Sequence, residues 1–332
     1  MALWRYRKRR VWRKRILIGS VLLFVAIIIV RLVSPGESNI EIREDTNKIN
    51  LYDHLTGQVI ELGLEEYVAG VVAAEMPASF HIEALKAQAV AARTYAVKRL
   101  QVSDPRVKAL SPLADISSDH QINQAWISDE EMRTRWGKWN YAENKKKIVR
   151  AVEETWGEVS IYEGQLIDPS YHASCGGLGT ENSGDVWKHQ VPYLQHAKCG
   201  NHPEGNHEAV VAMKIDTLAK KLGVETKEVP ASKIFGYTKA LQVTEKTSVG
   251  RIKSLTFGGR NFTGSELRSK LDLKSTMITW KIENDVVKFE TLGYGHAVGM
   301  CQHGANAMAQ EGKDYRQILS HYYQGTTIGK LK

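Results

Sequence analysis

Cysteine is scarce in this chain of 332 residues, which contains three: Cys175, Cys199 and Cys301. A low and odd count excludes the disulfide-dense scaffold of a small secreted domain. It leaves room for one disulfide and one remaining thiol. The chain is long enough to bury one large core or two ordinary cores without such bridges.

The sequence also lacks the regular alternation of strand and helix patterns that is typical of parallel α/β folds. Strand-like segments flank turn signals at residues 56–57 and 284–285, and helical patterns lie between them. This mixture predicts an α+β fold, with a single mixed catalytic domain over residues 51–332. We expect a substrate cleft in that domain.

Positive charge is in excess, but it does not indicate a nucleic-acid-binding protein. The formal net charge is +8, and much of it lies in a basic segment at residues 1–15. That segment precedes an apolar run over residues 16–30, which continues through Leu32 and Val33 past Arg31. The basic segment is therefore explained by its place beside a membrane span.

We interpret residues 16–33 as an uncleaved, single-pass transmembrane anchor. A cleaved signal peptide is the alternative, but the apolar run is long for one and no small-x-small cleavage site follows it. The basic segment predicts a cytoplasmic N-terminus. Residues 34–50 are polar and read as a linker, so the rest of the chain is expected to be extracytoplasmic.

Residues 64–100 contain the most informative stretch. Apolar residues recur at helical spacing on both sides of Pro77, which predicts two helices with a short break. Glu75 falls at the end of the first helix, among Val, Ala and Met residues. Loss of hydration would raise the pKa of its carboxyl group and make it a candidate general acid. A solvent-exposed Glu at a helix end is the alternative interpretation.

The residues of this stretch closely resemble the opening of the SpoIID family of sporulation proteins. They read Y-V-A-G-V-V-A-A-E-M-P, then E-A-L-K-A-Q-A-V-A-A-R-T-Y-A. Further matching strings are Y-H-A-S-C-G-G, E-N-S-G-D-V-W, G-S-E-L-R-S-K-L and G-Y-G-H-A-V-G-M-C-Q. The last string departs from the family pattern, with Ala297 in place of a Gly and Cys301 in place of a Ser. The resemblance runs from about residue 50 to the C-terminus.

The resemblance implies that Glu75 is the catalytic acid of a peptidoglycan lytic transglycosylase. It makes Arg93 a candidate for orienting Glu75 or binding substrate. Tyr171, His172, His296 and Gln302 lie in the matching strings and are the other candidate substrate-binding residues. The usual glycosidase needs two carboxylates, whereas a lytic transglycosylase uses the substrate's own C6 hydroxyl. One well-placed carboxylate therefore favours the latter.

Histidine and cysteine recur at the same short spacing in the second informative segment. His172 and Cys175 form one pair, and His196 and Cys199 form another. These four side chains could complete a tetrahedral zinc site, although the proposed reaction requires no cofactor. A Cys175–Cys199 disulfide is the competing interpretation for an extracytoplasmic segment, and buried free thiols are a third. His202 is expected to be solvated.

The family context implies a role in engulfment during endospore formation, at the mother-cell engulfing membrane. The expected partners are peptidoglycan glycan strands, the membrane, a peptidoglycan amidase that strips stem peptides, and other engulfment membrane proteins. No nucleic acid is expected. The rival functions are a non-catalytic wall-binding or amidase-modifying protein and a zinc amidase built on the histidine and cysteine residues.

Overall fold

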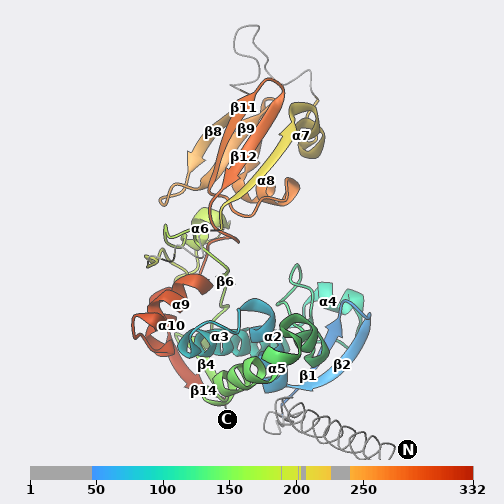
Figure 1. Cartoon of the computed structure of the whole chain (residues 1–332), viewed down its shortest axis with the longest axis vertical. Coiled ribbons are helices and arrows are strands. Elements are labelled where there is room, and N and C mark those ends of the chain that lie inside the picture. The colour runs from blue at the N-terminus through green and yellow to red at the C-terminus, as the bar shows by residue number, and fades with distance from the viewer. Residues whose placement is uncertain (1–46, 188, 201, 203–206, 226–239, 332) are drawn as a thin grey trace, which may run out of the picture.

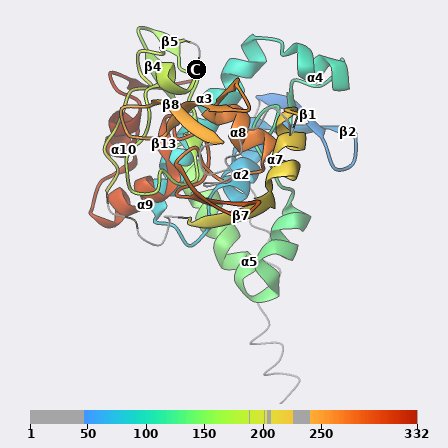
Figure 2. The same cartoon turned by 90° about the horizontal axis from the view of Figure 1, so that it is seen from above.

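The computed structural model describes residues 47–331 except 188, 201, 203–206 and 226–239. These residues combine helices with several small sheets, which confirms the α+β prediction. Their hydrophobic side chains gather in two large cores. Figure 1 shows two corresponding bodies, and Figure 2, viewed along the long axis, shows that they are stacked along it. We refer to them as the lower body and the upper body.

Three helices form the centre of the lower body. They are α2 (Leu64–Glu75), α3 (Ile82–Gln101) and α5 (Asp129–Glu153), and all three pack against one another. The break between α2 and α3 falls at Pro77, as predicted. The predicted apolar face of α2 is buried: Leu64, Val68, Val71 and Val72 are inaccessible or nearly so. The alanines of α3 let its neighbours approach its backbone closely.

Two small sheets flank these helices. One has the order β2-β1-β3 and is built from β1 (Lys48–Asp53), β2 (Gln58–Gly63) and β3 (Ile116–Ser117). The β1–β2 hairpin turns at the predicted residues 56–57. The other has the order β14-β4-β5 and is built from β14 (Thr327–Lys330), β4 (Glu158–Tyr162) and β5 (Gln165–Leu166). The short helix α4 (Pro105–Leu110) precedes β3.

A parallel pair of short strands brings distant parts of the chain together. β6 (Tyr171–His172) pairs with β13 (Met300–Cys301), so that Cys301 lies opposite His172. The helices α9 (Gln302–Gln310) and α10 (Tyr315–Tyr322) follow β13, and α6 (Ser183–Val186) follows β6. This pairing places the start of α9 beside the segment that holds Cys175.

The upper body lies between these two strands in the sequence. One sheet has the order β11-β12-β7, from β11 (Ile278–Glu283), β12 (Val286–Thr291) and β7 (Ala209–Lys214). The other has the order β10-β9-β8, from β10 (Arg260–Thr263), β9 (Ile252–Phe257) and β8 (Leu241–Lys246). The helices α7 (Ile215–Leu222) and α8 (Gly264–Lys270) complete it. The hairpin predicted at 284–285 joins β11 to β12.

A buried ion pair fastens the upper body to the lower one. Arg251 Nη1 lies 3.0 Å from Oε1 of Glu181, which also accepts a hydrogen bond of 2.6 Å from the Thr247 hydroxyl. Arg251 and Glu181 are both almost completely buried. Removing either partner would leave an uncompensated buried charge, so loss of one of these side chains is expected to destabilise the junction.

The predicted anchor at residues 16–33 lies outside the described residues. Among the residues that are described, no helix is both long and apolar enough to cross a membrane.

Candidate active site and a cysteine–histidine cluster

The carboxyl group of Glu75 is partly buried at the C-terminal end of α2. Its Oε1 accepts a hydrogen bond of 3.2 Å from the amide of Ala125, and Oε2 lies 3.5 Å from Nε2 of Gln302. Burial raises the pKa of Glu75 to about 7, while the hydrogen bonds from Ala125 and Gln302 act in the opposite direction. At neutral pH the group therefore populates both the acid and the carboxylate.

Three separate elements hold this carboxyl group. α2 supplies Glu75, the segment before α5 supplies the amide of Ala125, and the first residue of α9 is Gln302. Gln302 also donates a hydrogen bond of 3.2 Å to Oε1 of Gln88, a fully buried residue of α3. The side chain of Gln302 is thus fixed from two sides, and the donor it presents to Glu75 is preorganised.

Gly70 allows the segment of Ala125 to approach α2. A Cβ atom at this position would lie 2.0 Å from Nε1 of Trp126, so the indole occupies the space that any other residue would fill. The amide of Ile127 also donates a hydrogen bond of 3.4 Å to the carbonyl of Gly70. A helix glycine five residues before Glu75 therefore sets the position of the Ala125 donor.

Tyr171 lies close to Glu75. Its hydroxyl accepts a hydrogen bond of 2.7 Å from Nε2 of Gln124, and Oε1 of Gln124 accepts one of 3.2 Å from Tyr67. Burial raises the pKa of Tyr171, and the nearby charge of Glu75 raises it further. Tyr171 is therefore a neutral phenol beside the candidate acid.

His172 and His296 form a neighbouring aromatic group with Trp187. The ring centroids of the two histidines are 5.6 Å apart, and those of His296 and Trp187 are 5.7 Å apart. Burial, followed by the proximity of His172, lowers the pKa of His296 to about 3. His296 is therefore uncharged at neutral pH, and its Nδ1 accepts a hydrogen bond of 3.1 Å from the amide of Val298.

Arg93 does not occupy the position expected of it. Its side chain is 0 % exposed and forms a bidentate ion pair with Glu65, with 2.7 Å between Nε and Oε1. Nη1 donates a hydrogen bond of 3.1 Å to the carbonyl of Glu158. This corrects the expectation that Arg93 orients Glu75 or binds substrate. The guanidinium is instead used to join α2, α3 and β4.

The cysteines converge on a different set of partners from the one predicted. Cys175, Cys199, His202 and Cys301 place one ligand atom each within 4.8 Å of the others, so this cluster could bind a metal ion. His202 is buried, which corrects the expectation that it is solvated. His196 is not a member, because its Nδ1 lies 2.7 Å from the carbonyl oxygen of Thr180. We call these four residues the Cys3His cluster.

His172 stands beside the cluster rather than in it. The Nδ1 atom of His172 lies 3.2 Å from the carbonyl oxygen of Val298. The ring is also close enough to Cys175 for that thiol to influence the pKa of His172. All three cysteines are free in the structure, so the alternative Cys175–Cys199 disulfide is not formed. The neighbouring thiols Cys199 and Cys301 hold the pKa of Cys175 well below its usual range.

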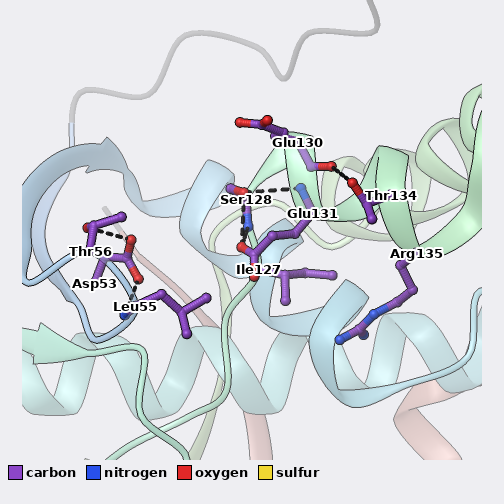
Figure 3. Close-up of a pocket in the computed structure, with 9 residues that line it drawn as sticks. All are labelled: Asp53, Leu55, Thr56, Ile127, Ser128, Glu130, Glu131, Thr134 and Arg135. Atoms are coloured by element: carbon purple, nitrogen blue, oxygen red, sulfur yellow. Dashed lines mark hydrogen bonds between the residues drawn. The ribbon is translucent and has the colours of Figure 1, made fainter.

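A cavity of about 490 Å³ lies apart from these groups, between the β1–β2 turn and the start of α5 (Figure 3). Its polar groups largely satisfy one another: Ser128 and Glu131 form a capping box, and Thr56 bonds to Asp53. Arg135 donates hydrogen bonds of 3.0 and 3.3 Å to the carbonyls of Ala73 and Ala74. The cavity thus adjoins the last turn of α2 without including Glu75.

Comparison with known proteins identifies the family. The sequence model of the family described as "Stage II sporulation protein" matches residues 52–162. Stage II sporulation protein D of Bacillus subtilis is 38% identical over 283 residues, which cover 85% of this chain and 79% of that protein. The chain belongs to the SpoIID family.

Two further relatives are informative. Stage II sporulation protein D of Bacillus amyloliquefaciens is 34% identical over 290 residues, which cover 87% of this SpoIID chain and 80% of that protein. The "Amidase enhancer" of Bacillus subtilis is 30% identical over 306 residues, but the match covers only 40% of its length. The family resemblance predicted from the sequence motifs is thus confirmed.

Sequence reasoning missed two residues at the Glu75 site and two members of the cluster, His202 and Cys301. Gln88 was visible as a polar residue within the alanine stripe of α3. The Ala125 donor is a backbone amide, which leaves no signal in the sequence. His202 follows Cys199 at the same x-x spacing as the predicted pairs, and Cys301 was marked by its departure from the family pattern.

Proposed function

We propose that this protein is a membrane-anchored lytic transglycosylase that cleaves the bond between MurNAc and GlcNAc in peptidoglycan glycan strands. The observation that carries the proposal is Glu75, a carboxyl group with a pKa of about 7, held by two hydrogen-bond donors in a member of the SpoIID family. A general acid works best when its pKa is near the working pH, and this environment supplies such a value.

The reaction would proceed with Glu75 as acid and then as base. The protonated carboxyl gives its proton to the bridging oxygen as the bond between that oxygen and C1 of MurNAc breaks. The C6 hydroxyl of the same MurNAc attacks C1, and the Glu75 carboxylate takes the proton of that hydroxyl. The products are a free GlcNAc hydroxyl and a 1,6-anhydro-MurNAc end, and no water is consumed.

The surrounding residues have separate parts in this scheme. Gln302 and the amide of Ala125 hold the carboxyl in one orientation and stabilise the carboxylate that forms after the first proton transfer. Tyr171 lies beside it as a neutral hydroxyl that can bond to a sugar. His296 is uncharged, and with Trp187 it offers an aromatic and polar surface to the glycan. His172 is buried, so it packs against the His296 ring and does not itself contact the sugar.

The cellular setting is part of the same proposal. Residues 16–33 anchor the chain with its N-terminus in the cytoplasm, and the catalytic body faces the extracytoplasmic space of the mother-cell engulfing membrane. The relatives named for stage II of sporulation support a role in spore formation. Glycan strands already stripped of stem peptides by an amidase would be the substrate.

For the metal of the Cys3His cluster we propose zinc. Three thiolates and one imidazole are a ligand set that zinc commonly takes in closed, structural sites. Such a site has no open coordination position for a reacting water, and this argues against a zinc amidase centred on these residues.

The direct test replaces Glu75 by Gln, which keeps the shape of the side chain and removes the transferable proton. We expect release of 1,6-anhydro products from purified, peptide-stripped peptidoglycan to fall at least about 100-fold. Glu66→Gln is the matched control, because Glu66 is an exposed acid on the same helix. Mass spectrometry of the digests would detect the products. Undiminished release of anhydro ends by the Glu75 variant would remove this residue from the mechanism.

A second function has one observation in its favour. The relative named "Amidase enhancer" suggests a protein that binds the wall or modifies an amidase without cleaving glycans. In that case Glu75→Gln would leave stimulation of an added amidase unchanged, and neither variant nor wild type would release anhydro ends.

A further inference from the structure

The Cys3His cluster has the dimensions of a single tetrahedral metal site. The Cys175 thiol sulfur lies 3.3 Å from Nε2 of His202, and the Cys301 sulfur lies 3.7 Å from the same nitrogen. With Zn–S bonds of about 2.3 Å and Zn–N bonds of about 2.0–2.1 Å, the edges of a zinc tetrahedron are roughly 3.5–3.8 Å long. The observed separations lie close to those edges.

The groups around the cysteines are those that stabilise thiolates. The amides of Cys175 and Gly304 each lie 3.3 Å from the Cys301 sulfur, so Cys301 caps the N-terminus of α9. The Tyr322 hydroxyl lies 3.1 Å from the Cys199 sulfur. Hydrogen bonds to metal-bound thiolates commonly orient them in this way, and a helix N-terminus favours the negative charge.

Gly304 leaves the room that this arrangement needs. A Cβ atom there would lie 2.2 Å from the Cys199 sulfur and 2.3 Å from the Tyr322 hydroxyl. Cys175, His202 and Cys301 are buried, and Cys199 is partly buried. The ligand atoms are therefore enclosed by protein and are directed at one another.

We propose that the Cys3His cluster is a structural zinc site that positions Gln302 for catalysis. Three segments meet at it: the strand–loop region of Cys175, the loop of Cys199 and His202, and the start of α9. Cys301 is the residue directly before Gln302, whose amide faces Glu75. The zinc ion holds the first turn of α9 in place, and so holds the donor to the acid.

The site also supports the junction with the upper body. Nη2 of Arg251 donates a hydrogen bond of 2.6 Å to the carbonyl of Cys175, and Nη1 of the same guanidinium pairs with Glu181. Cys175, a proposed ligand of the metal, is therefore linked to Glu181 through the buried guanidinium of Arg251. Removing the metal would loosen both the start of α9 and this junction.

The positioning role rests on the proposed function, whereas the zinc site itself does not. The experiment uses the full-length chain, purified in detergent with its thiols protected, and measures zinc, iron and copper by elemental analysis. We expect about one zinc per chain. Replacement of zinc by Co²⁺ is expected to give the strong visible bands of tetrahedral thiolate coordination.

Two ligand variants and one control complete the design. Cys301→Ser carries the residue typical of the family and should lose most of the zinc, unfold at a temperature several degrees lower, and cleave glycans more slowly. His202→Ala should do the same. His207→Ala is the control, since His207 is an exposed histidine of the same loop region that contacts His303 and not the cluster; it should keep its zinc.

The outcomes separate the two proposals. Wild-type protein without bound metal, or with a Cys175–Cys199 disulfide found by peptide mapping, overturns the zinc site. Stoichiometric zinc in a protein that releases no anhydro ends keeps the site and overturns the proposed function. Full zinc loss in Cys301→Ser with an unchanged cleavage rate keeps the site and overturns the positioning role.

Discussion

Gln302 at the start of α9 reaches the carboxyl group of Glu75 at the end of α2, with 3.5 Å between Nε2 and Oε2. These residues are far apart in the sequence, and they come together because α2 and α9 both pack against α3. The contact favours the carboxylate over the acid, because an amide N–H bonds more strongly to the anion. Gln302 thus moderates the effect of burial on the pKa of Glu75.

The first prediction concerns this contact. Gln302→Ala removes a donor that lowers the pKa of Glu75, so the alkaline limb of the pH–rate profile should move to higher pH while kcat falls. Gln310→Ala, at the exposed end of the same helix, is the control. An unshifted profile in Gln302→Ala would show that this amide does not act on Glu75.

The pH dependence of the wild type is the second prediction. In the proposed reaction Glu75 acts from its protonated form. Since its pKa is about 7, cleavage should decline as the pH rises above about 7. A fall in rate below pH 6, with full activity at pH 9, would contradict the assignment of Glu75 as the acid.

The same carboxyl group links stability to pH. Its pKa is raised on folding from 4.5 to about 7, so the folded state binds the proton more tightly and loses stability as pH rises between these values. The Glu75→Gln variant should not lose stability in this way, because its amide does not titrate. It should be more stable than wild type at pH 8 by about 1–3 kcal/mol, allowing for partial solvent contact, and equally stable near pH 4.5. Thermal unfolding at both pH values measures the difference.

Gly70 gives the fourth prediction. Gly70→Ala places a methyl group where the Trp126 indole lies, and overpacking of this kind costs about 1–3 kcal/mol. The displaced segment carries the Ala125 amide away from Glu75, so cleavage should fall as well. The double variant with Trp126→Leu relieves the clash and should recover part of both losses. Wild-type stability in the single variant would contradict the packing.

The pair Arg93–Glu65 gives the last prediction. Arg93→Lys and Glu65→Gln should each destabilise the fold strongly, by about 3–5 kcal/mol, because each leaves a buried charge without its bidentate partner. The double replacement by Met and Leu should cost much less. Unfolding in urea measures both. If Arg93→Lys kept its full stability and lost glycan binding, a substrate contact would be the better explanation.

The sequence predicted the elements well where local patterns decide them. Both helices around Pro77 and the two hairpins formed as expected, since helix periodicity and turn residues act over a few positions. The α+β class followed from the same patterns. The separate core of the upper body was not foreseen, because its strands pair across long intervals of the chain.

At the site, the sequence located Glu75 but not its surroundings. Gln302 was named because it lies in a motif, whereas the Ala125 donor depends entirely on how one loop packs against Gly70. Arg93 was misassigned because a family motif does not reveal which of two glutamates, Glu65 or Glu75, an arginine faces. His202 was misassigned because local polarity did not reveal its burial.

The position of Cys301 in the chain has a consequence for biogenesis. Cys175, Cys199 and His202 precede the whole upper body, and Cys301 follows it. During synthesis the first three members of the cluster are therefore made about 100 residues before the fourth. The cluster can be completed only after all the strands of the upper body have been synthesised.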